Sequence, residues 1–294
     1  MTQTNKKTLH ERNFHNDRYD FKALIQSEPS LNEFVKPNKY GDLSIDFANP
    51  QAVIALNKAL LSFFYGVKNW SIPSDYLCPP IPGRSDYIHH IADLLAASNG
   101  GKIPKGSYIK GLDVGIGANC IYPIVGVSVY GWSFTGSDID EVALKSAQNI
   151  INSNESLKEN IIVKLQTNSK NIFKNIISKE DKFDFTLCNP PFHKSQKDAI
   201  AGNKRKVQNL TKQVVSKAAL NFGGKNNELW CEGGEVAFIK KMIKESKEFS
   251  KNCLWFTTLV SRKENLDFIY DALEDIDVLE YKTINMAHGQ KISR

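Results

Sequence analysis

The 294-residue chain has few cysteines and no long apolar run. Its five cysteines are odd in number and include no Cys-x-x-Cys pair, which argues against a disulfide framework or a zinc site and indicates a reducing compartment. No window approaches about eighteen consecutive apolar residues, so no membrane span is expected. The first residues, MTQTNKKTLHERNFH, lack the apolar core of a secretory signal. These absences predict a cytoplasmic protein without a metal site.

Acidic residues are nearly absent from one part of the chain. The net charge of the whole chain is a mild +6, but residues 194–225 hold eight Lys or Arg against a single acid, Asp198, which gives +7. Such a segment is either a solvated charged loop or a contact for nucleic-acid phosphates. The first twenty residues are also basic and form either a disordered arm or a nucleic-acid-binding arm. The candidate contacts are Lys204, Arg205, Lys206, Arg12 and Arg18.

The pattern of apolar residues divides the chain into three parts. Residues 1–45 form the basic N-terminal arm, and residues 46–105 form a helical subdomain that includes FANPQAVIALNKALLSFFYG. Over residues 106–294 strands and helices alternate, which is typical of an α/β domain with a mostly parallel sheet. This domain would carry a basic insertion over residues 194–233. Six strands are expected at YIKGLDVG, WSFTGSDI, NIIVKLQ, KFDFTLC, CLWFTTLV and VLEYKTINMA.

Polar candidates stand at the ends of the predicted strands, where open parallel sheets bind their ligands. The first strand is followed by Gly115 and Gly117, which allow a tight turn close to a ligand, although any strand–turn–helix junction can use glycines. Asp113 lies at the end of the same strand. The second strand ends in Asp138, which is either a helix N-cap or an acceptor for a ribose diol. The third strand is followed by QTNSKN, where either Asn168 or Ser169 meets the adenine of a ligand, or the segment is an ordinary polar turn.

The fourth strand ends in CNPPF, where two prolines restrict the backbone directly after Asn189. Such a turn can be ordinary loop chemistry, but an Asn-Pro-Pro-aromatic turn 76 residues after Asp113 resembles the turn of methyltransferases that modify an exocyclic or amide nitrogen. That nitrogen is a poor nucleophile because its lone pair is delocalised, and two acceptors on its N–H groups would aim the lone pair at a methyl donor. The candidate acceptors are the Asn189 side-chain oxygen and the Pro190 carbonyl. Phe192 follows Pro191 and offers a stacking face for the base.

The D-x-G-x-G loop and the NPPF turn together resemble class I S-adenosylmethionine-dependent methyltransferases that modify exocyclic or amide nitrogens. Longer stretches narrow the resemblance: RNFHNDRYDFKAL, DFANPQAVIALNKALL, CPPIPGRSDYIHHIADLL, LNFGGKNNELWCEGGEVAFIKKMI and GQKISR. From about residue 8 onward the sequence resembles the bacterial ribosomal RNA large subunit methyltransferase F family, which makes N6-methyladenine at one adenine of 23S rRNA. The resemblance implies a Rossmann-like methyltransferase fold with a helical N-terminal extension.

The resemblance also implies the cofactor, S-adenosylmethionine, and the residues that hold it. Arg84, in PGRSDYIHH, would pair with the cofactor's carboxylate, which suits a bidentate guanidinium. Asn189 would contact the acceptor nitrogen, and the basic arm and the basic insertion would hold the RNA. The residues implied to bind the cofactor are Arg84, Asp113, Gly115, Gly117, Asn119, Asp138 and Ser169.

Two other functions fit part of this pattern. A protein glutamine methyltransferase would use the same turn on an amide nitrogen, and a non-catalytic RNA-binding module would use only the fold. The basic insertion favours nucleic acid, and the intact Asp113, Asp138 and Asn189 favour an enzyme. We expect a monomer that acts on 23S rRNA or on a large-subunit assembly intermediate. Because the resembled family continues past GQKISR into an apolar, aromatic strand, the last strand of the sheet is expected to be missing.

Overall fold

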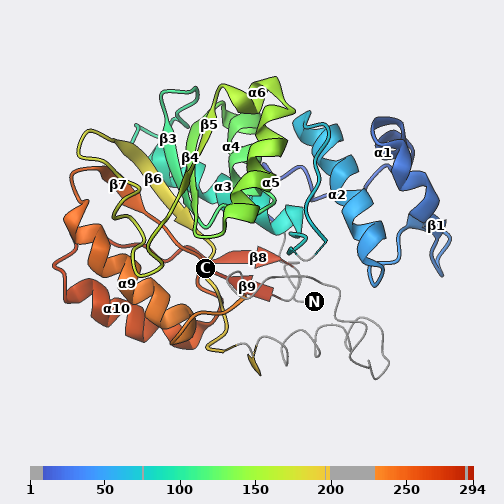
Figure 1. Cartoon of the computed structure of the whole chain (residues 1–294). Coiled ribbons are helices and arrows are strands. Elements are labelled where there is room, and N and C mark those ends of the chain that lie inside the picture. Colours follow the sequence, from blue (N-terminus) through green and yellow to red (C-terminus); the bar gives the residue numbers. More distant parts are fainter. Residues whose placement is uncertain (1–8, 75, 196, 199–228, 289–290) are drawn as a thin grey trace.

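The computed structural model describes residues 9–294 apart from 75, 196, 199–228 and 289–290 (Figure 1). Its centre is a five-stranded parallel sheet with the strand order β5-β4-β3-β6-β7. The strands are β3 (Lys110–Val114), β4 (Ser133–Asp138), β5 (Ile161–Leu165), β6 (Phe183–Cys188) and β7 (Cys253–Phe256). This architecture confirms the α/β fold with a mostly parallel sheet that the sequence predicts.

The order of the strands determines where a ligand can bind. From β3 the chain moves outward to β4 and β5, and it then returns to the other side of β3 with β6. Leu112 of β3 is thus paired with Thr135 of β4 on one side and with Thr186 of β6 on the other. Because the strands are parallel, the carboxyl ends of β3, β4 and β6 meet at one edge, next to this reversal of strand order.

Helices cover both faces of the sheet, and each face has its own core. On one face Ile124 and Leu144 pack in the same core as Phe185 of β6. On the other face Met242 packs with Leu112 and with residues of β6 and β7. None of the helices in the described part of the chain is long and apolar enough to cross a membrane. The helices of this domain within the described residues are α4 (Ile121–Tyr130), α5 (Glu141–Asn152), α6 (Glu155–Lys158), α9 (Gly234–Glu248), α10 (Leu266–Glu274) and the 3-10 turn η3 (Lys263–Asn265).

The N-terminal part is built around α2 (Pro50–Tyr65) and α3 (Ile81–Ala97). The Asn49 side chain caps α2 by accepting from two backbone amides, and Gly66 ends it in the left-handed conformation. Four shorter elements precede α2: α1 (Phe21–Ser27), η1 (Pro29–Phe34), β1 (Lys36–Pro37) and β2 (Leu43–Ser44). All these helices share one core with the sheet, and the domain boundaries near residues 45 and 105 stay predictions.

The sixth strand predicted at residues 278–287 is wrong for nearly all of that segment. No strand covers residues 278–285, and Leu279 there is fully exposed. Only β8 (Met286–His288) is extended, and it pairs antiparallel with β9 (Lys291–Ser293) in a separate two-stranded sheet. Alternating apolar residues favour a strand, but a strand also needs a partner, and within the described residues this segment does not pair with β7.

Candidate active site

The loop after β3 is shaped by two glycines with positive φ. Gly115 has φ +78° and Gly117 has φ +63°, a conformation that other residues adopt only with strain. The amides of Gly115 and Ile116 both donate to the Ser137 carbonyl, at 2.8 and 3.0 Å, so the loop is tied to the end of β4. A Cβ added at Gly115 would meet no protein atom within 4 Å. The loop therefore leaves open space directly above the sheet edge.

Asp138 and Asp140 have different roles at the end of β4. Asp140 is the N-cap of α5 and accepts from the amides of Val142 and Ala143. Asp138 therefore does not cap this helix: its Oδ2 accepts from the Gly117 amide at 2.9 Å, and its Oδ1 accepts from the Asp140 amide at 3.0 Å. Burial raises the pKa of Asp138. Its carboxylate oxygens keep further lone pairs for a ligand hydroxyl.

Asp113 is fully buried, and neither of its carboxylate oxygens has a hydrogen-bond partner in the part of the chain that the structure describes. Burial, together with the charge of Asp138, raises the pKa of Asp113 well above its usual range. The opposing charge is that of Arg84, on α3, whose Nη1 donates to the Tyr122 hydroxyl at 2.8 Å. A buried carboxylate without a partner is costly, and it indicates that a ligand carrying donors completes this site.

The NPPF turn begins where β6 ends at Cys188. The Cys188 carbonyl accepts from the Leu259 amide at 2.9 Å, so the strand end is held from the side of β7. Asn189 Oδ1 is buried and has no hydrogen-bond partner among the residues that the structure describes. After the turn, the His193 amide donates to the Leu229 carbonyl at 3.0 Å, and the Cys231 amide donates to the His193 carbonyl at 3.1 Å. The motif is thus fixed at both ends while its amide oxygen is left available.

One cavity of about 750 Å³ joins these features at the carboxyl edge of the sheet. Most of the predicted site residues line it: Arg84, Gly115, Gly117, Asn119, Asp138, Ser169, Asn189 and Pro191. Asp113, Pro190 and Phe192 are not among its lining residues, although all three adjoin residues that are. The cavity has room for a cofactor with amino-acid, ribose and base portions, and Arg84, Asp113 and Asp138 supply a cation and two acids for such a molecule.

Several residues that line the cavity were not predicted from the sequence. Tyr122 holds Arg84, Gln166 directly follows β5, Trp230 comes from the end of the basic insertion, and Lys241 lies on α9. Lys241 Nζ donates to the Ser169 carbonyl at 3.0 Å and so links α9 to the loop after β5. The only sequence signal for Trp230 was its place in the family-like stretch that contains WCEGGE.

The residues predicted to contact nucleic acid divide into three cases. Lys204, Arg205 and Lys206 lie outside the described residues. Arg12 is in contact with other parts of the fold, since its guanidinium donates to Asp93 Oδ1 at 2.6 Å and to the Tyr130 hydroxyl at 3.1 Å. The Arg18 side chain is 87% exposed and pairs only with Asp42 among its described neighbours. The role in RNA binding stays a prediction for all five.

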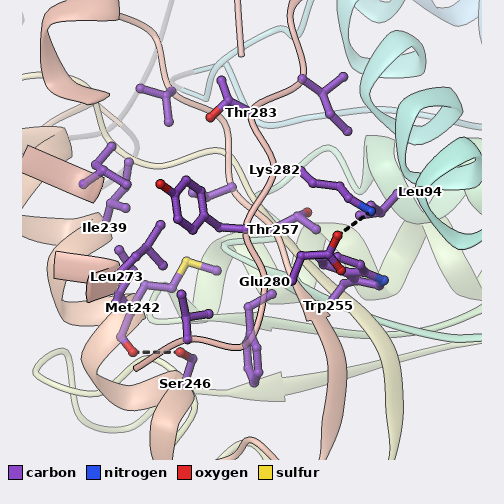
Figure 2. A pocket seen from close by; sticks show the side chains of 18 of the residues that line it. Leu94, Ile239, Met242, Ser246, Trp255, Thr257, Leu273, Glu280, Lys282 and Thr283 are labelled. Carbon is purple, nitrogen blue, oxygen red and sulfur yellow. Dashed lines mark hydrogen bonds and ion pairs between the residues drawn. The ribbon is translucent and has the colours of Figure 1, made fainter. Parts of the chain in front are cut away.

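A second cavity, of about 720 Å³, lies between β7, α9, α10 and residues 278–286. Figure 2 shows that its lining is largely apolar, with Met242, Leu273 and Trp255 pointing inward. Two of the lining residues, Lys282 and Glu280, form an ion pair at 3.0 Å. None of the predicted site residues lines this cavity. Among the residues that the structure describes, no group of three or more His, Cys, Asp or Glu could hold a metal ion.

Comparison with known proteins assigns the chain to a protein family. A family model described as RNA methyltransferase matches residues 3–294. Ribosomal RNA large subunit methyltransferase F of Serratia proteamaculans is 58% identical over 98% of this chain and 86% of its own length. The protein of the same name from Cytophaga hutchinsonii is 53% identical over 100% of this chain and 94% of its own.

Solved structures agree with the sequence relatives. The catalytic domain of hMettl16 bound to the MAT2A 3'UTR hairpin 1 superposes with a TM-score of 0.81 at 29% identity, covering 98% of this chain and 93% of that one. The N-terminal domain of human METTL16 in complex with SAH gives a TM-score of 0.75 at 26% identity, covering 98% and 96%. The chain therefore belongs to the ribosomal RNA large subunit methyltransferase F family of RNA methyltransferases.

Proposed function

We propose that this protein transfers a methyl group from S-adenosylmethionine to the exocyclic N6 of one adenine in 23S rRNA. The observation that carries the proposal is the position of Asn189 Oδ1, which is buried and without a partner at the end of β6. It lines the same cavity as Gly115, Gly117 and Asp138. An acceptor placed beside a cofactor loop is what an amino group needs if its lone pair is to be aimed at a methyl donor.

The cofactor supplies a methyl group on a positively charged sulfur, and the chain supplies the groups that hold the molecule in place. Arg84 would pair with the carboxylate of the methionine portion, and Asp113 would accept hydrogen bonds at that same end. Asp138 would accept from the ribose hydroxyls with the lone pairs that its two backbone bonds leave free. Ser169 would lie on the adenine side, while Gly115, Gly117 and Asn119 would form the floor.

The NPPF turn would hold the base to be modified. The Asn189 oxygen would accept one N6 hydrogen, and the Pro190 carbonyl would accept the other. Phe192 would stack on the ring, which is worth roughly 1–3 kcal/mol per base in other nucleic-acid complexes. An adenine in a helix or folded loop must leave its stack to reach such a cavity. The rigid turn would lower the entropic cost of presenting both acceptors at once.

The names of the similar proteins favour ribosomal RNA, rather than a glutamine of a protein, as the substrate. The relatives from Serratia and Cytophaga are named for ribosomal RNA, and the hMettl16 catalytic domain was solved with an RNA hairpin. The basic segment 194–225 has the charge that an RNA partner requires. We propose that free 23S rRNA or an assembly intermediate is bound in the cytoplasm, with contacts from the basic arm and from Lys204, Arg205 and Lys206.

The test uses tritiated S-adenosylmethionine and rRNA from a strain that lacks the enzyme. We expect the wild-type protein to label one adenine of 23S rRNA, with the methyl group at N6. Asn189→Ala should lower the rate roughly a hundredfold or more while cofactor binding persists. Asn160→Ala is a matched control, because its amide bonds only the Ser156 carbonyl among its described neighbours, outside the cavity. Label on protein, or undiminished transfer by Asn189→Ala, would refute the proposal.

A further inference from the structure

One tryptophan has an indole N–H that finds no partner among the described residues. The other three each donate to a carbonyl or hydroxyl oxygen 2.9–3.4 Å away: Trp70, Trp132 and Trp255. Trp230 Nε1 is buried and has no acceptor within the described part of the chain. An indole N–H can only donate, and leaving a buried donor unmet is unfavourable. This exception therefore points to an acceptor that the bound state supplies.

The unmet donor belongs to the candidate active site. In the described part of the chain, the buried side-chain nitrogen and oxygen atoms without a partner are both oxygens of Asp113, Asn189 Oδ1 and Trp230 Nε1. Asn189 and Trp230 line the same cavity, and Asp113 lies at the end of the adjacent β3. Unmet groups gathered at one place indicate a ligand rather than scattered packing faults.

Backbone pairing holds Trp230 beside the NPPF turn. His193, directly after the turn, forms a parallel bridge with Trp230. The two hydrogen bonds of this bridge join His193 to Leu229 and to Cys231, at 3.0 and 3.1 Å. The end of the basic insertion is thereby tied to the motif. Because of this pairing, the Trp230 N–H and the Asn189 side-chain oxygen, both without a partner among the described residues, lie in the same cavity.

A donor and an acceptor together match one edge of adenine. The N6 amino group donates, and the ring nitrogens that flank it, N1 and N7, only accept. We propose that the Trp230 N–H donates to one of these two ring nitrogens while Asn189 accepts from N6. Trp230 is then a substrate-recognition residue for the base. This inference rests on the proposed function, since it names how the same site selects its adenine.

The experiment replaces single atoms of the target. RNA fragments of 23S rRNA carry adenosine, 1-deazaadenosine or 7-deazaadenosine at the adenine mapped with the wild-type enzyme. Trp230→Phe keeps a ring but removes the donor, and we expect kcat/KM on adenosine RNA to fall roughly tenfold. One of the two deaza substrates should cost the wild type a similar factor. On that deaza substrate, kcat/KM of Trp230→Phe should be close to that of the wild type, because the atom removed from the RNA and the N–H removed from the protein belong to the same hydrogen bond.

Controls separate recognition from folding. Trp255→Phe removes an indole N–H that donates to Ser98 Oγ outside the cavity, and it should leave the substrate ratios unchanged. Trp230→His keeps a ring N–H and should recover part of the rate. The inference would be overturned if Trp230→Phe lowered kcat/KM by the same factor on adenosine RNA and on both deaza RNAs. It would also be overturned if the wild type acted equally fast on all three RNAs. Absence of N6 label on natural RNA would instead refute the proposed function.

Discussion

The Gly117 backbone amide donates to Asp138 Oδ2 over 2.9 Å, which joins the loop after β3 to the end of β4. This bond orients the carboxylate toward the cavity that both residues line. It also leaves the N-cap of α5 to Asp140, so Asp138 is available to a ligand. One side chain thus supports the loop that would lie beneath the cofactor and would offer an acceptor to its ribose.

Asp138→Ala should weaken the binding of S-adenosylmethionine by roughly ten- to hundredfold, because the variant removes hydrogen bonds to a charged acceptor together with the support of the loop. Calorimetric titration with the cofactor measures this directly. Asp20→Ala is the matched control: Asp20 also accepts from two backbone amides, as the N-cap of α1 far from the cavity. It should cost about 1 kcal/mol of folding stability and leave the affinity unchanged. Equal affinities of wild type and Asp138→Ala would contradict the ribose assignment.

Arg12 and Arg18 should differ in what they support. Arg12→Ala removes bonds to Asp93 and to the Tyr130 hydroxyl, and we expect the free energy of unfolding to fall by about 1–3 kcal/mol. Arg18 forms an exposed pair with Asp42, so Arg18→Ala should change it by less than about 1 kcal/mol. Urea unfolding of both variants gives the comparison. If Arg12→Ala were as stable as wild type but bound RNA more weakly, its role would lie in RNA binding.

The residues at strand ends could be predicted from the sequence, because the carboxyl ends of all strands of a parallel sheet lie at the same edge. Asp113, Asp138 and Asn189 each lie at or directly after the end of a buried strand, and in a parallel sheet such ends meet at one edge. Side chains brought in from elsewhere follow no such rule. Trp230 reaches the cavity only through its pairing with His193, after a long intervening segment, and no local pattern encodes that pairing.

Two predictions from the sequence missed contacts that form only in the folded protein: the strand over residues 278–287 and the place of Arg12 in a basic arm. The alternating residues 278–285 suit a strand, yet a strand forms only against a partner edge, which tertiary structure alone supplies. In the sequence, Arg12 is one more positive charge of the basic arm. In the folded protein, Asp93 neutralises this charge and the Tyr130 hydroxyl accepts a hydrogen bond from the guanidinium. Composition reports how many charges a segment has, and packing decides which of them remain available to a partner.

The basic segment should determine the salt dependence of RNA binding. Changing Lys204, Arg205 and Lys206 together to Ala should weaken binding and flatten the slope of log K against log salt, by roughly 0.7 to 0.9 for each phosphate that is no longer neutralised. Filter binding at several salt concentrations provides the slope. A triple change of exposed Lys102, Lys105 and Lys179 removes the same charge elsewhere and should lower the slope less. Equal slopes for both triple variants would assign the effect to net charge alone.

Acid should destabilise the fold through a buried histidine of the N-terminal part. Burial lowers the pKa of His15 to about 4 from 6.5, and its ring nitrogens lie 2.8 and 3.0 Å from the hydroxyls of Tyr65 and Tyr19. The unfolded chain binds a proton below pH 6.5, whereas the folded chain does so only near pH 4. Stability from the neutral ring is therefore complete above pH 6.5 and falls by about 1.4 kcal/mol for each pH unit between 6.5 and 4.

His15→Gln isolates this contribution, because glutamine cannot take up the proton. The variant should be less stable than wild type at pH 7.5, since it disturbs the contacts with both tyrosines, and the difference should shrink steadily toward pH 5. Urea unfolding at pH 7.5, 6.5, 5.5 and 5.0 measures the difference, and other titrating groups cancel because both proteins carry them. A difference that stays constant with pH would mean that the folded protein binds the proton at His15 as readily as the unfolded chain does.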